Sequence, residues 1–536
     1  MTHVNPSTGA AATSYDRPPN QAMDDRRFLG HPRGLGLLFL VEMWERFSYY
    51  GMRALLVLYL VNALRWDPAR ASLLYGAYTG SVYLTPLLGG WLADRILGTR
   101  RSLVIGGLVI ALGHFLLAFG PSPVALGAAS PGSAAMLPFY LGLVCVVIGT
   151  GFFKPNVSTM VGQLYNPGDD RRDAGFTIFY MGINTGAFIA PFICGWLGER
   201  VGWDYGFGAA GIGMLLGLVL FLYYRDKVMP GIGLPPVEGN EHMARAVDEP
   251  VARAAEALAA PQKADRSGNS VMHATIGAVI GGGLALFGAH WHVELANVLG
   301  ILMAAAAGAV FAVGVFGTRG DERKRMIALF MVVTFGMFFW LAFEQAGSSL
   351  TLFADKNTNR QLGSFLVPAS WFQSIQPLAI ILLAPVMAWL WRALARRHRE
   401  PSTSLKMVAG LALVGAGFLF LVVAGGPADR GVLVSPMFLV SAYLLHTVGE
   451  LCLSPVGLSY VTKVAPARFG SLMMGVWFLS TAAANYLGGF LASMMHEVPS
   501  LSKFFMIPVA TSFGAAIVML ALVPLLKKLT ASVADA

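Results

Sequence analysis

Apolar stretches long enough to cross a lipid bilayer recur along the whole of this chain. A transmembrane helix needs about 20 consecutive apolar residues, and short polar segments separate stretches of that length. Only 12% of the 536 residues are charged, whereas soluble domains carry about 25%. We therefore predict an all-α polytopic membrane protein with about 14 transmembrane helices. The predicted spans are 34–64, 70–95, 101–119, 136–161, 174–199, 204–225, 271–290, 293–317, 323–347, 367–391, 403–424, 434–460, 469–495 and 502–527.

The basic residues are divided unevenly between the loops on the two sides of these spans. If the N-terminus is cytoplasmic, most of the 38 Lys and Arg lie on the cytoplasmic side. This asymmetry is the positive-inside pattern of membrane proteins. The net charge of +9 therefore indicates orientation, with both termini cytoplasmic, and does not indicate nucleic-acid binding. The basic residues expected on the outer side are Arg65, Arg70, Arg200, Lys356, Arg360, Arg430 and Lys503.

A long polar segment, residues 226–270, divides the spans into two groups. Pro and Gly at its ends mark it as a cytoplasmic linker, and residues 1–33 read as a disordered cytoplasmic tail. Six spans at 34–225 precede the linker. The two spans at 271–317 are rich in Gly and Ala, which allow close helix packing in lipid, and we interpret them as an inserted helix pair. The last six spans occupy 323–527.

The first span carries charged residues in an otherwise apolar sequence. On a helix these residues and two tyrosines follow the spacing i, i+3, i+4, i+7, i+8 and i+11, which is one continuous face. A wrongly assigned span would scatter its charges around the helix, whereas these form a stripe. We expect the stripe to face protein or water, with Glu42 and Arg46 partly neutralising each other. Its members are Glu42, Glu45, Arg46, Tyr49, Tyr50 and Arg53.

Lys154, Glu344 and Glu450 lie deep in later spans. Insertion scales put a charge at the bilayer centre at about 2.5–3.5 kcal/mol, so each needs a partner or a role. One interpretation is a set of ion pairs that lock helices together. However, four acidic residues face three basic ones, which leaves one carboxylate without a fixed partner and able to take up a proton. Separated acids and bases also suit a ligand that carries both charges.

Three sequence motifs resemble those of the proton-dependent oligopeptide transporter (POT) family, a branch of the major facilitator superfamily. They are ExxERFxYYG in the first span, FFKPN in the fourth and FYMGINTGAFIAP in the fifth. The resemblance extends over about residues 34–527. It implies the major facilitator fold, with two six-helix bundles, and the inserted helix pair matches the two extra helices of prokaryotic members.

The segment GGWLADRILGTRR, from Gly89 to Arg101, resembles the superfamily's loop motif between helices 2 and 3. By that resemblance Asp94, Arg95, Arg100 and Arg101 would form a cytoplasmic charge latch. An ordinary basic inner loop is the alternative interpretation.

The resemblance also implies roles for single residues. Arg53 and Lys154 would hold a peptide carboxylate, Glu450 would hold the peptide amine, and Glu344 would be a proton-sensitive gate partner of Arg53. For each lone aromatic, an anchor at the lipid interface is the alternative. The residues implied in proton coupling are Glu42, Glu45, Arg46, Lys154 and Glu344. The residues implied in substrate binding are Tyr49, Tyr50, Arg53, Tyr83, Lys154, Asn184, Trp340, Glu344, Gln376, Glu450, Ser454 and Trp477.

The chain departs from the family pattern at two positions. Gln376 stands where the family usually has Asn, so its contact to the substrate amine would be altered. Gly76 stands where animal members have a histidine, so that route of proton handling would be absent. His446 precedes Glu450 by one turn, but two ligands are too few for a metal site, and we expect a hydrogen-bonded histidine. The three cysteines lie in apolar runs, which argues against a disulfide framework.

The expected function is a proton-coupled symporter that imports di- and tripeptides across the inner cell membrane by alternating access. We expect a monomer in membrane lipid with peptides and protons as partners, no nucleic acid, and no cofactor other than protons as the coupling ion. The alternative is a major facilitator transporter of another small solute, such as nitrate or a peptide-like molecule. A membrane enzyme is disfavoured because the sequence has no HExxH, no GxSxG and no nucleotide-binding loop. Two charge clusters in separate halves suit alternating access better than a channel.

Overall fold

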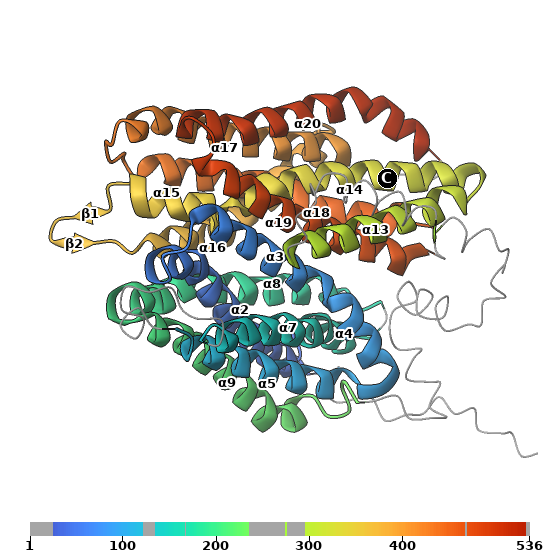
Figure 1. Ribbon diagram of the computed structural model, residues 1–536. Coiled ribbons are helices and arrows are strands. Elements are labelled where there is room, and N and C mark those ends of the chain that lie inside the picture. The colour runs from blue at the N-terminus through green and yellow to red at the C-terminus, as the bar shows by residue number, and fades with distance from the viewer. Residues whose placement is uncertain are drawn as a thin grey trace, which may run out of the picture.

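The computed structural model describes residues 25–121, 135–166, 168–234, 274–275, 295–466 and 469–531. These residues are almost entirely helical (Figure 1). The predicted tail up to residue 24, the linker from residue 235 and nearly all of the predicted span 271–290 lie outside the described residues.

The helices before residue 234 pack into one bundle, the N-half. Within it α5 packs against α7 and α9, while α2 packs against α8 and α9. Asp67 caps α3 by accepting a hydrogen bond from Ala69 N at 3.3 Å, and Pro68 follows at the first helical position, where a missing N–H costs nothing. The elements are α2 (Arg33–Leu58), η1 (Tyr59–Ala63), α3 (Pro68–Leu84), α4 (Pro86–Leu92), η2 (Ala93–Leu97), α5 (Thr99–Ala118), α7 (Leu137–Gln163), α8 (Arg171–Ala190), η3 (Pro191–Gly195), η4 (Leu197–Val201) and α9 (Trp203–Val228).

The helices after residue 318 form a second bundle, the C-half, in which α17 packs against α18 and α20, and α14 against α19. A two-stranded antiparallel hairpin of β1 and β2 projects from one end of it (Figure 1). We call this end of the molecule the hairpin side. The elements are α14 (Gly320–Phe343), η5 (Glu344–Gly347), α15 (Ser349–Asn357), β1 (Gln361–Leu362), β2 (Phe365–Leu366), η6 (Ala369–Ser374), α16 (Ile375–Arg396), α17 (Thr403–Asp429), α18 (Met437–Val464), α19 (Gly470–Ser493), η8 (Met494–His496) and α20 (Leu501–Leu529).

These helices match the predicted spans to within a few residues, except that η5 continues into the additional short helix α15. Within the described residues, nine helical stretches are long and apolar enough to cross a membrane. The outer faces of the helices expose large apolar side chains, among them Leu108 and Leu112 of α5 and Val144 and Ile148 of α7. Such faces suit contact with lipid, whereas charged side chains in membrane helices turn toward protein.

The inserted segment contributes one described helix, α13 (Leu295–Phe316). It packs against α14 and α19 of the C-half and also against α3 of the N-half. Met303 of α13 lies in a small apolar cluster with Leu479 and Ala482 of α19. The inserted helix therefore lies along the seam where the two halves meet.

The halves approach each other most closely where α3 packs along α19 (Figure 1). A Cβ added at Gly76 would lie 2.6 Å from Gly489 Cα, and one at Gly80 would lie 2.9 Å from Ala482 O. The backbones touch because both positions lack a side chain, which is how helices approach closely in membranes. Gly76 is thus required by packing, and the space for a histidine at this position is taken by α19.

Candidate functional site

The charged stripe of the first span is buried inside the protein, as its confinement to one face predicts. Glu42, Glu45 and Arg46 are each at most 3% exposed. Arg46 pairs with both oxygens of Glu45, with its Nη2 donating to Oε1 at 2.6 Å. Its Nε also lies 3.3 Å from Glu42 Oε1. The other Glu42 oxygen, Oε2, is buried and has no hydrogen-bond partner among the described residues.

Lys154 extends from α7 toward α3. Its Nζ lies 4.5 Å from the centre of the Tyr83 ring, a cation–π contact. The charges of Glu42, Glu45 and Arg46 reach it electrostatically, but within the described part of the chain no carboxylate forms an ion pair with it. Lys154 therefore lies near the charged stripe, but among the described residues it has no acidic partner.

Arg53 and Glu344 form a buried ion pair that joins α2 of the N-half to η5 of the C-half. Tyr75 of α3 holds the same guanidinium, because Arg53 Nε donates to its hydroxyl at 2.6 Å. Arg53 also lies over the Tyr50 ring, 5.5 Å from its centre. This is the pairing that the family resemblance implies for a gate, between residues 291 positions apart in the chain.

Glu450 of α18 is an acidic residue on the C-half side, opposite the basic Arg53 of the N-half. It is buried, and its Oε2 accepts a hydrogen bond from Gln376 Nε2 at 3.0 Å. No basic side chain among the described residues pairs with it. The charge count of the sequence predicted one carboxylate without a partner. Within the described residues, the structure leaves Glu450 without a cation and, in addition, leaves one oxygen of Glu42 without any partner.

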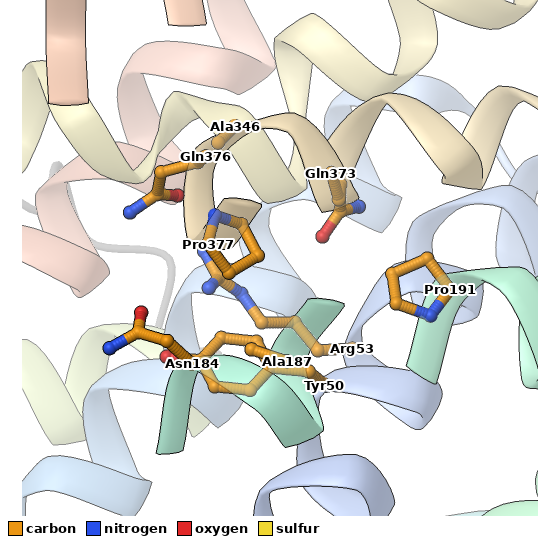
Figure 2. A pocket seen from close by; sticks show the side chains of 9 residues that line it. All are labelled: Tyr50, Arg53, Asn184, Ala187, Pro191, Ala346, Gln373, Gln376 and Pro377. Atoms are coloured by element: carbon orange, nitrogen blue, oxygen red, sulfur yellow. The ribbon is translucent and has the colours of Figure 1, made fainter. Parts of the chain in front are cut away.

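A small cavity of about 30 Å³ lies between the two halves. The close-up view shows side chains from both halves converging on it (Figure 2). This volume holds about one water molecule, so a larger ligand has to occupy space beyond it. The N-half contributes Tyr50, Arg53, Asn184, Ala187 and Pro191, and the C-half contributes Ala346, Gln373, Gln376 and Pro377.

Several predicted site residues lie away from this cavity. Tyr49 packs edge-on against Tyr50 and beneath Arg46. Trp340 contacts Phe343 of its own helix, and its ring N–H has no partner among the described residues. Trp477 lies against Gly336 and Gly457 of neighbouring helices.

Asn184 lines the cavity while its Nδ2 donates to Tyr180 O of its own helix at 3.0 Å. Ser454, which the sequence also assigned to the binding site, is partly buried in α18 but is not among the residues that line this cavity.

The structure places His446 away from the charged residues of the cavity. His446 is buried against the Phe418 ring at a centroid distance of 4.7 Å. Its polar neighbour is the Val414 backbone. Within the described residues no three His, Cys, Asp or Glu side chains gather as metal ligands would.

Arg100 of the loop motif contacts the C-terminal end of α9 and the residues after it. It binds Asp226 at 2.7 Å and the carbonyls of Met229 and Ile232, so it fastens the end of α9. Arg95 and Arg101 are exposed, and the Asp94 side chain lies outside the described part.

Sequence reasoning missed Tyr75, the partner of Arg53, and Gln373, which lines the cavity. Gln373 precedes Gln376 by three residues in WFQSIQP, so two amides on one helix face in an apolar run were the available signal. Tyr75 lies eight residues before Tyr83, the only residue of its helix that the sequence assigned to the site. Nothing in the local sequence distinguishes its role, because its partner belongs to another helix.

Comparison with known proteins agrees with this arrangement of charged residues between two helical bundles. The sequence profile of the POT family, PTR2, matches residues 100–507. The chain is 39% identical over 524 residues to the "Peptide transporter YePEPT" of Yersinia enterocolitica, covering 93% of this chain and 96% of that one. It is 35% identical over 487 residues to a "Di-/tripeptide transporter" of Lactococcus lactis, covering 86% and 89%.

The crystal structure of a POT family transporter in complex with 5-aminolevulinic acid superposes with a TM-score of 0.76 at 30% identity, covering 94% of this chain and 99% of that one. Together these matches confirm the major facilitator fold that the sequence motifs predict. The chain belongs to the POT family of membrane transporters.

Proposed function

We propose that this protein imports di- and tripeptides together with protons by alternating access. The observation that carries the proposal is the separation of charge at the interface between the halves. Arg53 lies on the N-half side of the cavity, and the cation-free Glu450 lies on the C-half side, bonded to the cavity residue Gln376. A peptide zwitterion carries a carboxylate and an amine that match these two poles.

Lys154 supports the same assignment. It is a half-buried base on the N-half without an acidic partner among the described residues, so a substrate carboxylate can supply one without first displacing a protein carboxylate. Arg53, in contrast, is already paired with Glu344 and Tyr75. A peptide carboxylate at Arg53 therefore has to compete with the gate pair, which links binding to gate opening.

Proton coupling is assigned to the acidic stripe and the gate. Glu42 keeps one buried oxygen free of protein partners, and protonation would remove the cost of a buried charge that is only partly neutralised. Protonation of Glu344 would weaken its ion pair with Arg53. We place the residues Glu42, Glu45, Arg46, Lys154 and Glu344 in the proton pathway.

We further propose that the protein lies in the inner membrane as a monomer with cytoplasmic termini. The positive-inside asymmetry of the loops supports this orientation. It places the hairpin side outside the cell.

A peptide-like solute is the second candidate. A relative at 30% identity binds 5-aminolevulinic acid, a small molecule that also carries an amine and a carboxylate. The two poles described above would suit such a molecule, whereas nitrate has no positive group for Glu450.

The test is uptake of a labelled dipeptide by vesicles that contain only this protein, with and without an inward proton gradient. We expect accumulation only with the gradient, and competition by unlabelled tripeptide but not by nitrate. Glu450→Gln, which keeps the shape and removes the charge, is the matched variant and should lose affinity for the dipeptide. Accumulation of 5-aminolevulinic acid without dipeptide uptake would favour the second candidate, and competition by nitrate would contradict both.

A further inference from the structure

One carboxylate on the hairpin side makes its hydrogen bonds across the interface between the halves. Glu199 belongs to η4 of the N-half. Its Oε2 accepts from Ala369 N at 2.8 Å, and its Oε1 accepts from Ser370 N at 2.9 Å. These two residues begin η6 of the C-half. Backbone N–H groups at a helix start have no partner within the helix, so Glu199 acts as an N-terminal cap supplied by the opposite half.

The capped segment leads directly into the cavity wall. η6 continues into α16 as one helical stretch, Ala369–Arg396. Gln373, Gln376 and Pro377 of this stretch line the cavity. On the other half, Ala187 and Pro191 line the same cavity on the helix that leads to Glu199. The cap therefore sets the spacing between two walls of the cavity at its hairpin end.

Neighbouring contacts join the same two halves. Ser374 Oγ donates to Phe188 O at 2.9 Å, and Asn62 Nδ2 donates to Asp355 Oδ2 at 2.9 Å. Arg360 binds Asp355 at 2.8 Å and lies 3.8 Å from Glu199 Oε2. In this set Glu199 makes two hydrogen bonds to backbone N–H groups of the C-half.

We propose that Glu199 is a positioning residue of the outer gate. While the cavity is closed on the hairpin side, its carboxylate holds η6 and α16 against η4 of the N-half. The cap has to release each time the cavity opens to that side. Release is reversible because, once the halves separate, water can satisfy both the carboxylate and the exposed N–H groups. The proposal rests on alternating access, but it does not depend on which solute is carried.

The test measures opening on the hairpin side without any substrate. Cys145, Cys194 and Cys452 are replaced by Ala, and Ala187→Cys places one thiol in the cavity wall. A membrane-impermeant maleimide is then added on the hairpin side of sealed membrane vesicles. Glu199→Ala should raise the labelling rate about tenfold, equivalent to 1.4 kcal/mol in the gate equilibrium. Glu199→Gln, which keeps one acceptor oxygen, should raise it less.

Asp204→Asn is the matched control. Asp204 is an exposed carboxylate in the first turn of α9, at the same end of the N-half, and its neutralisation should leave the labelling rate unchanged. Unchanged labelling in Glu199→Ala, or an equal rise in Asp204→Asn, would overturn the proposal.

A transport measurement separates positioning from a general structural role. If Glu199→Gln favours the outward-open state, the apparent KM for external substrate should fall, because more of the protein is competent to bind from outside. A loss of maximal rate with an unchanged KM and unchanged labelling would show that Glu199 only stabilises the fold. The labelling experiment needs no substrate. Its result therefore tests the role of Glu199 even if the protein does not transport peptides.

Discussion

Gln376 donates a hydrogen bond to Glu450 at 3.0 Å. Glu450 is the carboxylate that we propose binds the substrate amine, so the Gln376 amide already uses one of its oxygens. The resemblance to the family implies the shorter Asn at this position. The extra methylene of Gln lets the amide reach the carboxylate directly. A substrate amine therefore has to displace this hydrogen bond or share the carboxylate with it.

Gln376→Asn should strengthen binding of peptides with a free amine. The shorter side chain withdraws the competing donor, and a neutral hydrogen bond contributes about 1 kcal/mol, so we expect an affinity gain of a few fold. Binding measured with a dipeptide and with its N-acetylated form checks this, because only the free amine should gain. Equal changes for both peptides would show that Gln376 acts on the cavity shape.

Glu42→Gln should separate exchange from accumulation. The substitution fixes residue 42 in a neutral, protonated-like form and keeps its shape. Exchange of peptide for peptide moves no net proton and should survive, whereas uphill accumulation should fail. Counterflow and gradient-driven uptake in the same vesicles measure the two. Loss of both, or of neither, would remove Glu42 from the proton pathway.

Glu45→Gln, in the same charged stripe, should behave differently from Glu42→Gln. Both Glu45 oxygens bind Arg46, and breaking a buried ion pair by removing one partner costs about 3–5 kcal/mol. We therefore expect this variant to lower thermal stability and to impair exchange as well as accumulation. Thermal unfolding of the purified variants should place Glu45→Gln below Glu42→Gln.

Lys154→Ala should abolish proton-driven uptake while changing stability little. Lys154 contributes a cation–π contact with Tyr83 but no ion pair among the described residues, so few protein contacts are lost. Lys227→Ala is the control, because Lys227 makes a similar contact with Tyr223 at 3.7 Å away from the charged stripe. Normal accumulation by Lys154→Ala, or equal loss by Lys227→Ala, would contradict the role.

Gly76→Ala should destabilise the contact between the halves. Its Cβ would lie 2.6 Å from Gly489 Cα, and overpacking typically costs about 1–3 kcal/mol. Thermal unfolding should shift downward and transport should fall. Gly208→Ala is the control, since a Cβ there meets nothing within 4 Å and Ala is the better helix former. A Gly76 variant as stable as the parent would show that α3 and α19 separate easily.

Asp169→Asn should reduce stability in a pH-dependent way. Hydrogen bonds from the Arg171 side chain lower the pKa of Asp169 below its ordinary value, and the Arg171 backbone N–H adds to this against a smaller effect of burial. The stabilisation is therefore present above the unfolded pKa of about 3.9 and is lost as pH falls through the lower folded pKa. The variant should unfold at a lower temperature than the parent at pH 6, and the difference should shrink below about pH 4.

The control for this prediction is Asp170→Asn, which changes the adjacent exposed carboxyl. Its unfolding temperature should follow that of the parent across the same pH range. A difference between Asp169→Asn and the parent that stays constant with pH would show that the carboxylate charge is not involved.

The amino-acid sequence by itself determined the helices and the buried stripe. Apolar length and the helical period are local properties, and in lipid the backbone has to satisfy its own hydrogen bonds. The ends of the spans and the common face of Glu42, Glu45, Arg46 and Arg53 therefore follow from the chain alone. The motifs of the first, fourth and fifth spans likewise indicated the family before any contact was known.

Only the tertiary structure decided which charges meet. The sequence places four acids and three bases deep in its apolar spans, and any base can in principle pair with any acid. The packing of the two halves brings Arg53 to Glu344, but within the described part of the chain it leaves Lys154 and Glu450 without ionic partners. The position of Glu199 beneath η6 depends on the same packing. Distances between helices far apart in the chain are set by how their surfaces fit, and no local pattern encodes them.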